Sequence, residues 1–278
     1  AESGAWVVLS EIEQSIKKKI EVVGKPLKDW DINIYRGILT GYNDAFIITT
    51  EKRDEILSNC KDDEERSKTS EIIRPILRGR DIKRYGYDWA NLWLINTHNG
   101  IKGKIPRIDI NDYPAIKAHL DQYWDKIKDR ADQGDTPYNL RNCAYLEDLS
   151  LPKIIYPDIM RMPRTSEKLA QYPYFTIDKG GMIPEATLFM MTGEDLEQIC
   201  AFLCSEIGFY AFSRFYMGPV FDATGFRYKK EYLQNLPIPI VTNPDGNYET
   251  QLMDILNLTA EEYGFIQMYK NHLLLNNE

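Results

Sequence analysis

The chain has 278 residues, of which 43% are hydrophobic and 27% charged, and its formal net charge at pH 7 is −8. This composition is ordinary for a soluble globular protein. Four scattered cysteines exclude a disulfide framework, and no apolar run is long enough for a membrane span, so we expect reduced cysteines, no membrane partner and a cytoplasmic location.

The N-terminal part predicts one helix followed by two strands. The chain starts without an initiator Met or a signal-peptide pattern, which favours a segment of a longer protein. Apolar residues at helical spacing predict an amphipathic helix over residues 6–23, ended by Gly24. Residues 32–38 and 45–50 have the composition of strands, and the polar segment 40–44 predicts a turn that joins them as a strand–turn–strand unit.

The middle of the chain mixes strands and helices. Apolar runs predict strands over residues 92–96, 153–156 and 174–177. A proline starts a predicted helix over residues 114–130, which has one apolar side. A further helix, over residues 194–215, is apolar almost all round and should therefore be buried.

Four residues in this helix or just before it carry specific predictions. Thr192, with Asp195 three residues later, predicts the helix cap. Cys200 and Cys204 lie four residues apart and so share one helix face. A metal pair is conceivable there, but no histidine or third cysteine is near in sequence, so core packing is the favoured interpretation.

The C-terminal part contains an extended strap and a helical tail. Two prolines in the run LPIPI, residues 236–240, exclude a helix and predict an extended strap that closes the module. Thr259 and Glu262 predict a capping box at the start of the last helix. Together the elements predict a mixed α/β (α+β) fold with flanking helices at both ends.

Positive charge is concentrated in one stretch of this acidic chain. Residues 74–107 contain only two acidic side chains, Asp81 and Asp88. The stretch contains eight basic residues, namely Arg74, Arg78, Arg80, Lys83, Arg84, Lys102, Lys104 and Arg107. A basic strip on an acidic body can dock on phosphate; a solvated charged face is the simpler interpretation.

Signatures of catalysis are absent from the sequence. The three histidines are dispersed, and no nucleophile elbow, phosphate-binding loop or dinucleotide fingerprint occurs. The Asn/Asp-Pro-Pro-Tyr/Phe motif of DNA amino-methyltransferases is also missing, and the nearest string, NPDG at residues 243–246, lacks its second proline and its aromatic residue. We therefore expect a chain that binds rather than catalyses.

Several segments, in the same order, carry a resemblance to a known family. The chain resembles the TaqI-like C-terminal specificity domain of type IIG restriction–modification enzymes and adenine-specific DNA methyltransferases over residues 30–240. Residues 161–183 do not match. The matching segments are GILTGYNDAFII, KTSEIIRPILRGRDIKRY, WLINTHNG, DYPAIKAHL, NLRNCAYLEDLSLPKIIYPDI and FRYKKEYLQNLPIPI.

The resemblance implies a DNA target-recognition domain over residues 25–240. Residues 1–24 would be a connector helix to a methyltransferase or endonuclease core, and residues 241–278 a helical tail. The partners would be double-stranded DNA and that core. The domain would have no cofactor of its own, because S-adenosylmethionine would bind the core. Residues 161–183 would then contribute to the choice of DNA sequence.

Basic and amide side chains in the matching segments are the candidate DNA contacts. Some would fix the register on phosphates and others would read base edges. The arginines of residues 78–84 are as well explained by internal ion pairs, for instance with Asp81. The predicted DNA-binding residues are Asn43, Arg78, Arg80, Lys83, Arg84, Lys102, Lys104 and Arg107.

An alternative function stays open on the sequence alone. The basic strip would equally suit a protein-interaction module that docks on the methyltransferase core or on an acidic partner. In neither case is the chain expected to be an enzyme by itself.

Overall fold

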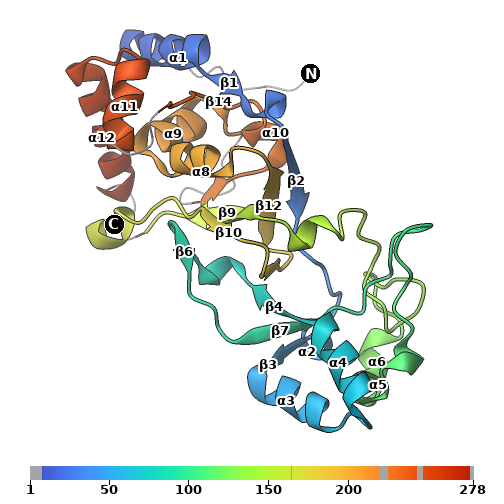
Figure 1. Cartoon of the computed structure of the whole chain (residues 1–278). Helices are drawn as coiled ribbons and strands as arrows, with labels where there is room; N and C mark the ends of the chain where they lie inside the picture. Colours follow the sequence, from blue (N-terminus) through green and yellow to red (C-terminus); the bar gives the residue numbers. More distant parts are fainter. Residues whose placement is uncertain (1–7, 164, 219–224, 243–246, 276–278) are drawn as a thin grey trace.

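The structure is a computed structural model that describes residues 8–163, 165–218, 225–242 and 247–275 (Figure 1). The NPDG string and the first residues of the predicted N-terminal helix lie outside these ranges. The described residues form two lobes, each with its own cluster of buried apolar side chains, and both lobes mix helices with small sheets. The predicted α+β fold is thereby confirmed.

The large lobe is built on an antiparallel sheet of four strands in the order β10–β8–β12–β2. Its central strand β12 pairs with β8 on one side and with β2 on the other, so it is buried along most of its length. The strand bounds are β2 (Ile32–Arg36), β8 (Lys153–Pro157), β10 (Thr176–Asp178) and β12 (Leu188–Gly193).

Helices pack beside this sheet, and the set includes helices from both ends of the chain, as the sequence predicts (Figure 1). Their apolar side chains form one cluster with those of β2, β8 and β12. The helix bounds are α1 (Glu11–Val23), α8 (Leu196–Cys204), α9 (Glu206–Ala211), α10 (Lys230–Leu233), α11 (Tyr248–Ile255) and α12 (Ala260–Leu275).

The small lobe contains a second sheet, in the order β11–β4–β7–β3, with helices packed beside it. Its strands are β3 (Ile47–Thr49), β4 (Ile73–Leu77), β7 (Leu92–Ile95) and β11 (Ile183–Pro184). Its helices are α2 (Asn43–Phe46), α3 (Thr50–Ser58), α4 (Asp63–Ile72), α5 (Pro114–Asp121) and α6 (Trp124–Ile127).

The predicted strand–turn–strand unit is wrong. β2 pairs with β12 in the large lobe, β3 pairs with β7 in the small lobe, and residues 43–46 form the helical turn α2. Ile34 is buried in the first apolar cluster and Ile48 in the second. A hairpin would have placed both strands in one sheet, whereas the chain crosses between the lobes here.

Two predicted helices are interrupted. Residues 122–123 separate α5 from α6, and Ser205 separates α8 from α9. The Ser205 hydroxyl accepts a hydrogen bond from the Gly208 amide at 2.8 Å and so caps α9. The predicted Thr192–Asp195 cap is wrong, because Thr192 donates to Asp148 and the Asp195 side chain makes no capping bond. The predicted burial is confirmed, and both Cys200 and Cys204 are core residues.

Three two-stranded ribbons complete the fold. β1 (Lys25–Pro26) pairs with β14 (Pro237–Ile238), so the LPIPI run is the extended strap that the sequence predicts. β9 (Ile159–Arg161) pairs with β13 (Gly225–Arg227), and β5 (Ile82–Lys83) with β6 (Gly86–Tyr87). The last ribbon projects from the small lobe toward the large one (Figure 1).

The ends of the chain are joined by a buried carboxylate. Glu262 forms the predicted capping box with Thr259, and it also accepts from Lys19 at 2.6 Å and from the Ser15 hydroxyl at 2.7 Å. Its side chain is 6% exposed. Burial alone would raise the pKa of Glu262, but these hydrogen bonds outweigh it and lower the pKa to about 2.

This carboxylate predicts a pH-dependent stability. Because its folded-state pKa lies below 4.5, its contribution is complete above that pH and is lost as the pH falls toward about 2. Glu262→Gln should lower the free energy of unfolding at pH 7 by about 2 kcal/mol. The difference from the wild type should vanish near pH 2. Urea titrations across this range test it, with the exposed Glu261→Gln as control; a difference independent of pH would contradict it.

Candidate nucleic-acid interface

A groove of about 790 Å³ lies where the two lobes meet. Two chain crossings between the lobes contribute residues to it. In the first, the Gly37 and Ile38 amides donate to the Leu188 and Pro184 carbonyls, each at 2.8 Å. In the second, the Glu185 amide donates to the Leu77 carbonyl at 2.9 Å. The groove is lined by Arg36, Asn43, residues 78–80, residues 157–161, Tyr174 and residues 185–187.

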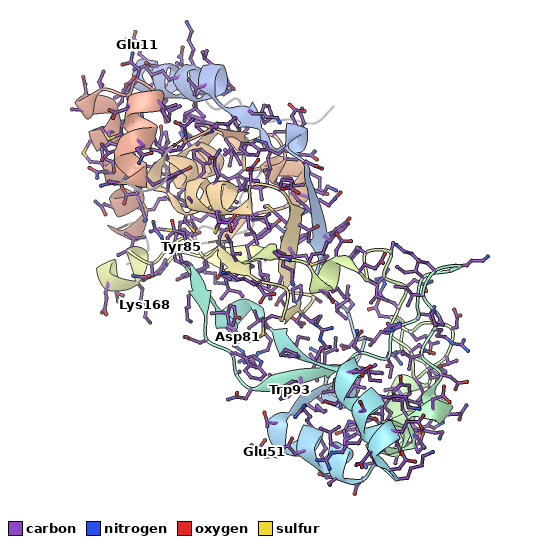
Figure 2. All side chains as sticks on the ribbon, viewed as in Figure 1. Glu11, Glu51, Asp81, Tyr85, Trp93 and Lys168 are labelled. Carbon is purple, nitrogen blue, oxygen red and sulfur yellow. The ribbon has the colours of Figure 1, made fainter. Side chains whose placement is uncertain are left out.

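Arg78 and Asp81 form a fixed ion pair at the groove wall. Asp81, which is 4% exposed, accepts from Arg78 Nη2 at 2.9 Å, from Nε at 3.1 Å and from the Arg78 amide at 2.8 Å. Asp81 lies near the meeting of the two lobes (Figure 2). The internal partner considered for these arginines is therefore present for Arg78, and its positive charge is largely compensated.

Two other arginines of the groove have a charge that no ion pair compensates among the described residues. Arg36 and Arg80 are exposed, and neither forms an ion pair with any residue that the structure describes. Arg36 Nε donates to the neutral carbonyl of Ala186 at 2.9 Å. These two side chains are therefore available to an anionic ligand.

Polar and acidic groups share the groove with these arginines. Asn43 is exposed and accepts from the Thr40 hydroxyl through Oδ1 at 2.6 Å, which leaves its amide nitrogen to donate elsewhere. Glu185 is engaged by the Thr187 amide and hydroxyl, and Asp158 lies 3.4 Å from Arg227. The Glu185 carboxylate thus accepts hydrogen bonds from Thr187, and the Asp158 carboxylate lies beside the Arg227 guanidinium. Burial raises the pKa of Tyr174, so that its phenol stays neutral.

Three further predicted residues lie in a second cavity of about 730 Å³. Lys102 and Lys104 line it from a tight loop closed by the bridge between Ile101 and Ile105, and Arg107 lines it just after that loop. Lys104 pairs with Glu147, and Arg107 lies 3.4 Å from Asp135. Lys102 is exposed at the tip of the loop.

Lys83 and Arg84 belong to the β5–β6 ribbon and do not line either cavity. Lys83 lies 3.5 Å from Asp88, and Arg84 donates to the Ala170 carbonyl at 3.0 Å. Tyr85, beside them, lies at the same edge of the molecule as Lys168 (Figure 2). The eight predicted residues therefore fall into three places, and only Asn43, Arg78 and Arg80 share the groove.

Two arginines of the groove, Arg36 and Arg161, were not among the residues predicted from the sequence. Arg36 immediately precedes the glycine of the first matching segment, so its position in the sequence was a usable signal. Arg161 opens the segment that the resemblance does not match, and it lies in the groove with Tyr174 from the same segment. No local pattern marked Arg161, because the other arginines of the groove are distant from it in sequence.

The described residues offer no metal centre: nowhere among them do three His, Cys, Asp or Glu side chains gather as ligands. Burial lowers the pKa of His98 and of His119. None of the described helices has the length and apolar character needed to cross a bilayer.

No protein-family model matches the chain. Among curated proteins it is similar to two type II methyltransferases. M.BstVI of Geobacillus stearothermophilus is 23% identical over 267 residues, which are 93% of this chain and 42% of the relative. M.BanIII of Aneurinibacillus aneurinilyticus is 24% identical over 184 residues, 64% of this chain and 29% of the relative. The chain thus spans less than half the length of either.

Two solved structures share its fold. One is the type IIG restriction endonuclease BpuSI, with a TM-score of 0.52 and 13% identity over 95% of this chain and 32% of that one. The other is the type IIL restriction–modification enzyme MmeI, solved in complex with DNA, with a TM-score of 0.52 and 11% identity over 90% of this chain and 33% of that one. The chain is therefore similar to a part of restriction–modification proteins.

Proposed function

We propose that the chain is the DNA target-recognition module of a restriction–modification enzyme, a TaqI-like specificity domain that binds double-stranded DNA. The groove between the lobes carries this proposal. It collects four arginines and an exposed amide at the junction of two lobes in a chain of net charge −8. Guanidinium and amide groups are the side chains that contact phosphates and base edges.

The distribution of charge supports this assignment. Arg36 and Arg80 are exposed and have no ion-pair partner in the described part of the chain, so an anionic ligand would supply the missing counter-charge. The loop that bears Lys102 presents a second cationic point in the small lobe. Two separated cationic sites suit a duplex, whose phosphates repeat along its length.

The comparisons support the same proposal. The curated relatives are type II methyltransferases, and one structural neighbour was solved with DNA. We infer that residues 25–240 form the recognition module, between a connector helix and a helical tail. A methyltransferase core outside this module would bind S-adenosylmethionine and carry out the chemistry. The module itself would then catalyse neither methyl transfer nor cleavage.

The proposal predicts salt-dependent DNA binding. The logarithm of the association constant should fall with the logarithm of salt concentration at a slope of about −0.9 per phosphate neutralised. Arg80→Ala should reduce that slope by about 1, because it removes one uncompensated charge. Fluorescence anisotropy with a labelled duplex, from low to moderate salt, measures it. Arg66→Ala, an exposed arginine on α4 outside the groove, is the control and should leave the slope unchanged.

Arg78→Ala separates folding from binding in the same assay. Since Arg78 is held by Asp81, its removal should lower thermal stability and change the slope less than Arg80→Ala does. Unchanged DNA binding in both variants would contradict the groove assignment. Replacing Lys83 and Arg84 together reports on the ribbon instead, and should reduce the slope by up to about 2 where both touch phosphate.

A protein-docking function is the second candidate, and exposed apolar side chains near the two ends of the chain favour it. Val22 on α1 is 76% exposed and Met268 on α12 is 64% exposed. Such side chains suit a contact with the methyltransferase core.

An acidic protein that binds in the groove is the other form of this alternative. A competition assay with a labelled duplex distinguishes it from DNA binding, because polyglutamate would then displace the labelled duplex as effectively as unlabelled DNA does.

A further inference from the structure

Arg36 has a backbone that is fixed from several sides. It is the last residue of β2, and it pairs with Phe189 of β12. Its carbonyl accepts a hydrogen bond from the Tyr145 hydroxyl at 2.7 Å, and the Tyr145 ring stacks on Tyr35 with ring centroids 4.3 Å apart. The next residue, Gly37, lies directly against the Glu185 carbonyl. The position from which the side chain enters the groove is therefore well defined.

The Arg36 side chain is oriented by a neutral partner, so its positive charge is not compensated. Arg36 Nε donates to the Ala186 carbonyl, a neutral acceptor, at 2.9 Å. A guanidinium has five N–H donors in one plane, so an anchored Nε leaves the two terminal amino groups as a fork. That fork matches the O6 and N7 acceptors of guanine in the major groove of DNA.

Arg78 and Arg80 differ from Arg36 in these two respects. Arg78 offers its Nε and Nη2 to the Asp81 carboxylate, which compensates its charge. Arg80 is exposed, and its guanidinium has no hydrogen-bond partner among the described residues, so nothing directs its fork. A guanidinium whose orientation is not fixed suits a phosphate. A guanidinium whose orientation is fixed and whose charge is not paired suits a base edge.

We propose that Arg36 is a specificity-determining residue that reads a guanine edge, while Arg80 contacts phosphate. This inference rests on the proposed DNA-recognition function and deepens it. Ala186 would be the positioning residue, acting through its backbone carbonyl. A single bidentate pair of this kind discriminates against a wrong base by about tenfold or more.

The test uses the whole chain and a pool of short duplexes with a randomised centre. Bound duplexes are sequenced for the wild type, Arg36→Lys, Arg80→Ala and the α4 control Arg66→Lys. Arg36→Lys keeps the charge but loses both the fork and the Nε anchor. It should relax the preference for guanine at one position by about tenfold and leave the salt slope unchanged. Arg80→Ala should weaken binding to all sequences alike.

The outcomes separate this inference from the proposed function. If the wild type prefers one base and Arg36→Lys keeps that preference, the proposed role of Arg36 is overturned and DNA recognition stands. A wild type that binds every duplex equally would also overturn base reading by Arg36. A wild type with no affinity for any duplex would overturn the proposed function and this inference together. Melting temperatures of all variants identify any loss of folding, which we do not expect at an exposed side chain.

Discussion

Lys153→Met is expected to lower the free energy of unfolding by about 3–5 kcal/mol, because it leaves a buried carboxylate without its counter-charge. Lys153 is fully buried in β8, and its Nζ donates to Asp178 at 2.9 Å and to the Leu149 and Leu151 carbonyls at 3.0 and 3.1 Å. All three ammonium donors are thus satisfied. Desolvation lowers the pKa of Lys153, and the Asp178 carboxylate opposes this shift.

Asp178 depends on Lys153 in turn. It is 4% exposed and also accepts from the amides of Gly180 at 3.0 Å and Met182 at 3.1 Å, so it organises the turn after β10. Urea unfolding followed by circular dichroism measures the loss. Combining Lys153→Met with Asp178→Asn should recover part of it, because the unpaired charge disappears.

Lys83→Met is the matched control for this prediction. Lys83 is exposed and lies 3.5 Å from Asp88, so its removal should change stability by less than about 0.5 kcal/mol. Equal effects of the two lysine replacements would show that the buried pair at Lys153 contributes no more than a surface charge.

Gly37→Ala is the second change with a large expected effect, a loss of about 3 kcal/mol or more. A Cβ atom at this position would lie 2.1 Å from the Glu185 carbonyl oxygen and 2.6 Å from the Pro184 oxygen. Both are backbone atoms, so the two chain crossings between the lobes would have to separate. The Gly37 amide bond to Leu188 would be disturbed as well.

The same change should also disturb DNA binding, because Arg36 and residues 185–187 line the groove on the two crossings. Affinity for a duplex should therefore fall even where the variant remains folded. Gly264→Ala is the control. A Cβ there meets nothing within 4 Å, and a helical Gly-to-Ala change should stabilise α12 by up to about 1 kcal/mol. A well-folded Gly37→Ala chain with wild-type stability would contradict the close approach of the crossings.

The sequence by itself determined several local elements of this protein. The strap at LPIPI, the capping box of Thr259 and Glu262, and the burial of α8 all follow from signals within a few residues. So does the ion pair of Arg78 and Asp81, which was an open alternative and lies within one turn. These signals depend on neighbouring residues, so they can be read without knowing the fold. The predicted cap at Thr192 and Asp195 failed because Thr192 bonds to the remote Asp148 instead.

The tertiary structure decided how these elements combine. β2 pairs with β12, far away in sequence, rather than with the strand that follows it, because alternation reveals a buried face but not the partner strand. The ion-pair partners of Lys153 and Lys104 are likewise remote in sequence, namely Asp178 and Glu147. The groove joins six separate segments, so which arginines share it, and which keep an uncompensated charge, depended on long-range contacts that no local pattern records.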